Sequence, residues 1–142
     1  MQFCNEIENH HKTEKMKGLL ITAAVVNLAV AVIHTFIGEN DIIATLLATD
    51  APDTVRWTLH SAWHMISVVL YMSSFTLFYV SRKDKNDPYS KIFPNYIGIQ
   101  YIPLAMVFVV TSLVYGIFFP QIVMLAPIGI LALLAGRRTK NA

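Results

Sequence analysis

The chain has 142 residues, of which 55% are hydrophobic and only 14% are charged, and its formal net charge is +2. This composition excludes an ordinary soluble domain, because a water-facing surface needs more polar residues, and the length suits one domain rather than two. We therefore expect residues 1–142 to form a single transmembrane domain with the lipid bilayer as its main partner.

Runs without any charged residue mark the candidate membrane spans. The runs 18–38 and 57–81 are each about as long as one helix needs to be to cross a bilayer. The run 92–136 is about twice that length, so it must fold back, and Pro120 places the turn near 118–121 because proline cannot continue a helix but starts one well. Lipid offers the backbone no hydrogen-bond partners, so the spans should be helices.

The sequence thus predicts an all-α fold, a membrane-embedded four-helix bundle with spans near 18–38, 57–80, 96–118 and 121–136. Of the 11 Lys and Arg residues, only Arg56 falls between the first two spans, and the others share the side of both termini. The positive-inside rule predicts that this side is the cytoplasm. The basic residues lie in short segments next to the spans, which argues against nucleic acid as a partner.

The first external loop, 39–56, is expected to contain a short interfacial helix lying flat on the lipid headgroups. Its apolar residues fall on one helical face, and they are Ile42, Ile43, Leu46 and Leu47. Asn40 or Asp41 is expected to cap its first turn, and Asp53 or Thr54 to cap the second span, because short polar side chains accept hydrogen bonds from free helical N–H groups.

Small and polar side chains recur at helical spacing on the first three spans. The first span carries Ala24, Asn27, Ala31, His34 and Gly38. The second carries His60, His64, Ser67, Tyr71 and Ser74. The third carries Gly98, Tyr101, Ala105, Phe108, Ser112 and Tyr115. Lipid does not favour such faces, so we expect them to point toward one another inside the bundle.

Three histidines and one glutamate are expected at a common depth near the outer end of the bundle. His34 lies near the end of the first span, whereas His60 and His64 lie near the start of the second. Glu39 follows at the mouth of this layer. Imidazole nitrogens and carboxylate oxygens suit zinc, copper or iron, so the sequence predicts a metal site made of these four residues. Haem held by His34 and His64 from facing helices is a variant of this hypothesis.

Other interpretations of the polar pocket stay open on the sequence alone. The histidines can have a purely structural role, in which they hydrogen-bond to neighbouring helices. They can also act, together with Glu39, as titrating groups in a proton-linked transport component. The protein could also be a small accessory or assembly subunit of a larger membrane complex, or a homo-oligomer. Tyr115 and Gln121 are expected to reach the same layer. The sequence does not decide whether the protein is an enzyme, because no nucleophile stands at useful spacing from a base.

Two short segments carry a resemblance to a known family. HTFIGE, from His34 to Glu39, and WHMIS, from Trp63 to Ser67, resemble the pattern of uncharacterised small four-helix bacterial integral membrane proteins. The resemblance covers about the first half of the chain, and it implies a location in the bacterial cytoplasmic (inner) membrane. It implies that His34, Glu39, Trp63, His64 and Ser67 form one constellation, which does not require His60. It implies no particular function.

Overall fold

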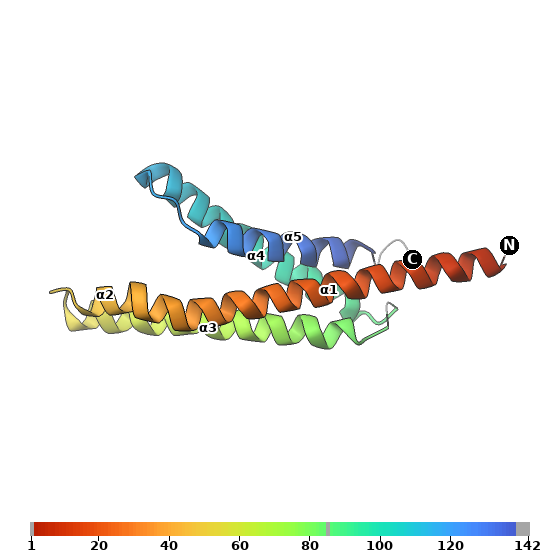
Figure 1. The fold of residues 1–142 in the computed structure, drawn as a ribbon, viewed down its shortest axis with the longest axis horizontal. Coiled ribbons are helices and arrows are strands. Elements are labelled where there is room, and N and C mark those ends of the chain that lie inside the picture. The colour runs from red at the N-terminus through yellow and green to blue at the C-terminus, as the bar shows by residue number, and fades with distance from the viewer. Residues whose placement is uncertain (1, 85, 139–142) are drawn as a thin grey trace.

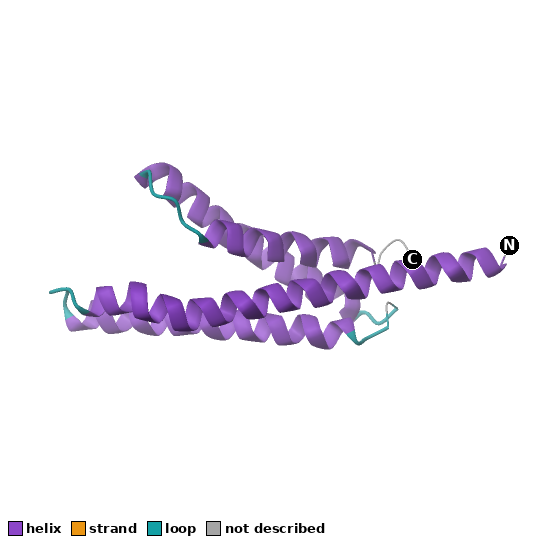
Figure 2. Cartoon of the chain, in the orientation of Figure 1, coloured by secondary structure: helices purple, strands orange, loops and turns teal. Residues whose placement is uncertain are grey.

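The computed structural model describes residues 2–84 and 86–138, and these residues fold into helices joined by short loops (Figures 1 and 2). The helices are α1 (Gln2–Gly38), α2 (Ala44–Leu47), α3 (Asp53–Ser81), α4 (Tyr89–Tyr115) and α5 (Gln121–Arg138), and a π-helical segment, η1 (Glu39–Ile43), lies between α1 and α2. The prediction of an all-α fold is confirmed for this part of the chain.

Three of the helices are long and apolar enough to cross a membrane, namely Thr13–Leu47, Asp53–Ser81 and Tyr89–Tyr115. The fourth apolar helix, Gln121–Arg137, falls in the shorter class. With 18 residues, α5 is about 27 Å long, slightly less than the roughly 30 Å of a bilayer core. Four apolar helices are therefore present in the predicted order, whereas the cytoplasmic placement of the termini stays a prediction.

The segment after Gly38 is helical as expected, but it is not a separate element. Gly38 has ordinary right-handed helical angles, so the chain continues through η1 and α2 as an extension of α1. Asn40 caps nothing, because its Nδ2 donates to Phe36 O at 2.8 Å within the same helical run. The prediction of an independent interfacial helix capped by Asn40 or Asp41 is wrong for this reason.

The start of α3 and the ends of α4 also differ from the predictions. Pro52 precedes α3 without any side-chain cap, and Asp53 pairs with Arg56 instead of capping the helix. Helix α4 runs from Tyr89 to Tyr115, not over 96–118. The predicted turn after this helix is confirmed.

The helices pair into two antiparallel hairpins, α1 with α3 and α4 with α5 (Figure 1). Helix α5 also packs against α1, whereas α3 and α4 make few contacts. The hairpins meet near the α3–α4 connection and diverge toward the end that carries α2 and the α4–α5 turn. Of the residues that the sequence expects at the outer end, His34 and Gln121 line the space between the two hairpins.

A buried polar network ties α1, α3 and α4 together. Asn27 is fully buried, its Nδ2 donates to Leu70 O at 3.1 Å, and its Oδ1 accepts from the Tyr101 hydroxyl at 3.0 Å. Nearby, Ser74 Oγ donates to Ala24 O at 2.8 Å. The polar faces of the first three spans therefore meet, as expected, at the depth of Asn27 and Ser74.

Asn27→Leu is expected to lower the free energy of unfolding by about 1–3 kcal/mol, because the buried Tyr101 hydroxyl loses its acceptor. Reversible unfolding in bicelles measures this change. Asn40→Ala is the matched control, because Asn40 is exposed and bonds only within its own helix, so its expected effect is within about 0.5 kcal/mol. Equal stability of the two variants would contradict a structural role for the network.

Candidate metal centre

Glu39, His60 and His64 form a compact cluster where the end of α1 meets α3. His60 Nε2 lies 2.8 Å from Glu39 Oε1 and 3.0 Å from His64 Nε2. The distance from His64 Nε2 to Glu39 Oε2 is 3.7 Å. Among the residues that the structure describes, these three form the one group of His, Cys, Asp or Glu side chains whose potential ligand atoms all lie within 4.8 Å of one another.

The local structure explains why these three side chains meet. His60 and His64 are one helical turn apart on α3, so both imidazoles lie on the same face. Gly38 allows α1 to approach α3 closely, because any larger side chain there would collide with the ring of Trp63. Glu39 then begins the π-helical turn, a distortion that often occurs at functional sites.

The cluster lies at the margin of the protein rather than deep inside it. The side chains of His60 and Glu39 are 22% and 34% exposed, and that of His64 is 50% exposed. An ion can therefore enter without unfolding of the helices. The same exposure leaves room for further ligands beside the three protein atoms.

The two short contacts of His60 Nε2 cannot both be ordinary two-centre hydrogen bonds. An imidazole nitrogen carries either one hydrogen or one lone pair in the ring plane. If the hydrogen of His60 Nε2 points to Glu39, none is left for the contact with His64, and if the lone pair of His60 accepts from His64, the carboxylate faces it without a hydrogen. A cation bound by all three atoms removes this conflict.

The spacing of the three atoms suits a small transition-metal ion. Ligands at 2.0–2.1 Å from a tetrahedral zinc ion lie about 3.3 Å apart. The two imidazole nitrogens are 3.0 Å apart, His60 Nε2 is 2.8 Å from Glu39 Oε1, and His64 Nε2 is 3.7 Å from the other carboxylate oxygen, Oε2, so the separations lie on both sides of this value. Small rotations of the side chains would bring three ligand atoms to it.

His34 is not part of this cluster. Its ring stacks on the Trp63 indole with centroids 3.9 Å apart and planes at 14°, and its Nε2 lies 3.3 Å from Trp63 O. The structure thus brings together three of the four predicted metal ligands. It also gives His34 and His64 different partners, so the arrangement does not fit haem held between them.

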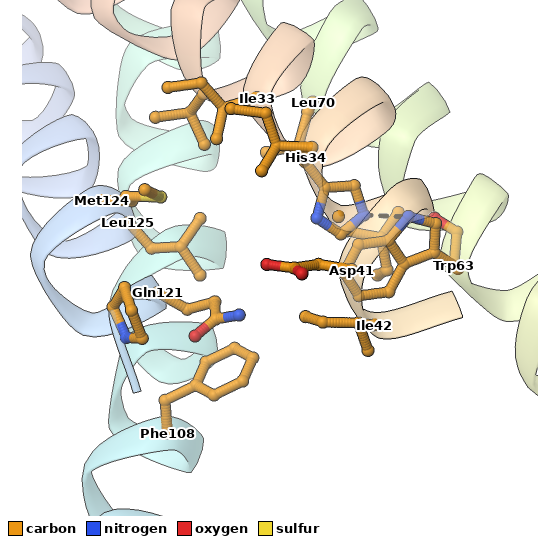
Figure 3. A pocket seen from close by; sticks show the side chains of 15 residues that line it. Ile33, His34, Asp41, Ile42, Trp63, Leu70, Phe108, Gln121, Met124 and Leu125 are labelled. Carbon is orange, nitrogen blue, oxygen red and sulfur yellow. Dashed lines mark hydrogen bonds between the residues drawn. The ribbon is translucent and has the colours of Figure 1, made fainter. Parts of the chain in front are cut away.

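The sequence analysis expects two residues of the second hairpin, Tyr115 and Gln121, to reach the histidine layer, and the structure agrees only in part. The side chain of Tyr115 is 70% exposed and does not reach the histidines, because α4 diverges from α1 and α3 at this end. Gln121, at the start of α5, does face His34 across the gap (Figure 3). The prediction is therefore wrong for Tyr115, whereas Gln121 approaches His34 but not the cluster.

A cavity of about 200 Å³ occupies the space between the diverging hairpins. Most of its wall is apolar, with Ile33, Ile42, Leu70, Phe108, Met124 and Leu125 among the lining residues. Figure 3 shows that His34, Asp41 and Gln121 add polar groups to this wall. Sequence reasoning missed the role of Asp41, although Asp41 follows His34 by two helical turns and so returns to the same face.

The chain matches no protein-family model, and no curated protein or solved structure matches it. The resemblance to small bacterial membrane proteins stays a prediction. The function is therefore argued from the cluster and the cavity alone.

Proposed function

We propose that this membrane protein binds one divalent transition-metal ion through Glu39, His60 and His64. The observation that carries the proposal is the convergence of three ligand side chains at His60 Nε2, where one cation satisfies both short contacts and two separate two-centre hydrogen bonds cannot. Two imidazole nitrogens and one carboxylate oxygen favour zinc, cobalt, iron or copper over magnesium or calcium. We take zinc as the first candidate.

Three protein ligands leave at least one coordination position open, as in exchangeable or catalytic zinc sites. A bound ion would act there as a Lewis acid toward water or a substrate. The segment that follows Glu39 is acidic in sequence, with Asp41, Asp50 and Asp53, and negative charge at this end of the bundle favours cation approach. If the positive-inside orientation holds, this end of the bundle faces the cell exterior.

Binding of Co²⁺ to the purified protein in lipid nanodiscs tests the proposal, because Co²⁺ occupies zinc sites and absorbs visible light. We expect one Co²⁺ per chain, displaced by Zn²⁺ and lost as the pH falls, since protonated imidazoles cannot bind metal. The double variant His60→Ala/His64→Ala should not bind. His34→Gln should bind like the wild type, because His34 lies outside the cluster.

A proton-linked role is a second candidate, supported by the same contacts. Glu39, His60 and His64 all carry groups that can exchange protons, and His60 Nε2 lies within 3.0 Å of an atom of each neighbour. This alternative predicts no stoichiometric metal binding and a proton flux in liposomes that Glu39→Gln abolishes. Stoichiometric Co²⁺ binding in the wild type, lost in the double variant, would decide for the metal.

A further inference from the structure

Three side chains on the wall of the cavity can accept hydrogen bonds, and they are His34, Asp41 and Gln121. The wall also carries donors, because Gln121 has an amide NH₂ group and the buried indole N–H of Trp63 has no partner among the described residues. Trp63 O is a carbonyl and can only accept, so the His34 Nε2 beside it carries the hydrogen, and the neutral ring keeps a free lone pair on Nδ1. Figure 3 shows this second ring nitrogen turned toward the cavity. The Asp41 carboxylate enters the same space.

Gln121 supplies the third acceptor from the opposite wall. Its Oε1 is buried and has no hydrogen-bond partner among the residues that the structure describes. A buried carbonyl oxygen without a partner is costly, so this atom indicates a missing donor. The three acceptors come from both hairpins. Figure 3 shows the amide nitrogen of Gln121 on the side of Asp41, so a half-turn of the amide brings Oε1 toward a donor placed beside Asp41 and His34.

Aromatic and aliphatic side chains form the rest of the wall. The stacked rings of His34 and Trp63 lie on one side and Phe108 on the other. Aromatic faces attract organic cations. The aliphatic side chains of Ile33 and Leu125 complete an apolar surface large enough for a small hydrocarbon body.

We propose that this cavity binds a small primary amine in its protonated form, with the ammonium group facing Asp41, His34 and Gln121 and the apolar body packed against Phe108. An ammonium group has three hydrogens, which match the three acceptors, and its charge complements the carboxylate. An alcohol offers one hydrogen and no charge, and a carboxylic acid offers like charge. This site is separate from the proposed metal centre, because none of the three metal ligands lines the cavity.

The test uses 2-phenylethylamine and two analogues of the same shape, 2-phenylethanol and phenylacetate, with the protein in lipid nanodiscs. The chain has two tryptophans, and Trp57→Phe leaves Trp63, on the cavity wall, as the sole tryptophan, whose emission can be excited selectively over that of the six tyrosines. We expect a saturable change in Trp63 emission with the amine. Binding of the alcohol should be about tenfold weaker, as expected for loss of one charge interaction, and phenylacetate should not bind.

Asp41→Asn should lower the affinity for the amine about tenfold and leave the affinity for the alcohol unchanged, which shows that the cavity is intact. Asp50→Asn, in the same loop but outside the cavity, is the control and should change neither affinity. His60→Ala/His64→Ala should also keep amine binding, so failure of the metal proposal does not affect this one. Equal affinities for the amine and the alcohol, no effect of Asp41→Asn, or no saturable signal because lipid chains fill the cavity would each overturn the proposal.

Discussion

His60→Ala is expected to lower the affinity for Co²⁺ at least about 100-fold. His60 Nε2 is the central atom of the cluster, 2.8 Å from Glu39 Oε1 and 3.0 Å from His64 Nε2. Without it, only His64 and Glu39 remain as ligands, and His64 Nε2 lies 3.7 Å from Glu39 Oε2. Loss of a group that merely supports a metal ligand costs 10–100-fold in affinity, so loss of a ligand should cost at least the upper value. Competition with a chelator of known affinity measures this change.

The other two ligands provide graded comparisons for this experiment. His64→Ala should weaken binding less than His60→Ala, because His64 is the most exposed of the three and lies farthest from Glu39. Glu39→Gln keeps an oxygen ligand but removes its charge, and we expect a loss of roughly tenfold. If His60→Ala bound Co²⁺ as tightly as the wild type, the ion would have to occupy some other site, and the proposed function would be wrong.

Gly98→Ala is expected to destabilise the protein by about 2–3 kcal/mol, the upper part of the range for overpacking. Gly98 lies where α4 crosses α5, and an added methyl group would be 2.9 Å from the backbone oxygen of Gly129 and would collide with Leu133. The side chain of Leu133 can move, but the backbone oxygen moves only if the two helices separate. Small residues permit this close approach of helices in lipid, where apolar burial contributes little to association.

Gly18→Ala is the matched control for the same measurement, reversible unfolding in bicelles. Apart from the neighbouring residues and backbone of its own helix, no described atom lies within 4 Å of the position that a methyl group would occupy at Gly18, so no collision occurs. Alanine is the better helix former, and this variant should be unchanged or more stable by up to about 1 kcal/mol. If Gly98→Ala and Gly18→Ala had equal stabilities, the close α4–α5 crossing would not contribute to the fold.

Local sequence patterns determine the number of helices and much of what faces inward. Charged residues cannot easily lie in hydrocarbon, so the charge-free runs indicate the helices and their order. The helical period of 3.6 residues then shows which side chains share a face, and it correctly pointed Asn27, Ser74 and Tyr101 into the interior. These features depend only on residues that are near one another in the chain.

The composition of the site depends on contacts between distant residues. Periodicity predicts inward faces for His34, His60 and His64, although His64 is half exposed in the structure. It does not set the separation or the axial offset of two helices to within a few ångströms. The close approach at Gly38 sets both, and it brings Glu39 to His60 while His34 stacks on Trp63. Metal ligation is sensitive to differences of this size, so the sequence could suggest the ligand types without deciding which residues meet.

The cavity is decided by tertiary structure alone. It exists because the α4–α5 hairpin diverges from α1 and α3, and no local pattern encodes the angle between two hairpins. The sequence by itself determined an apolar chain of four helices with a histidine-rich layer, because backbone hydrogen bonding and charge exclusion act locally. Only packing between the hairpins decided that Gln121 faces His34 across an open space and that Tyr115 lies outside it.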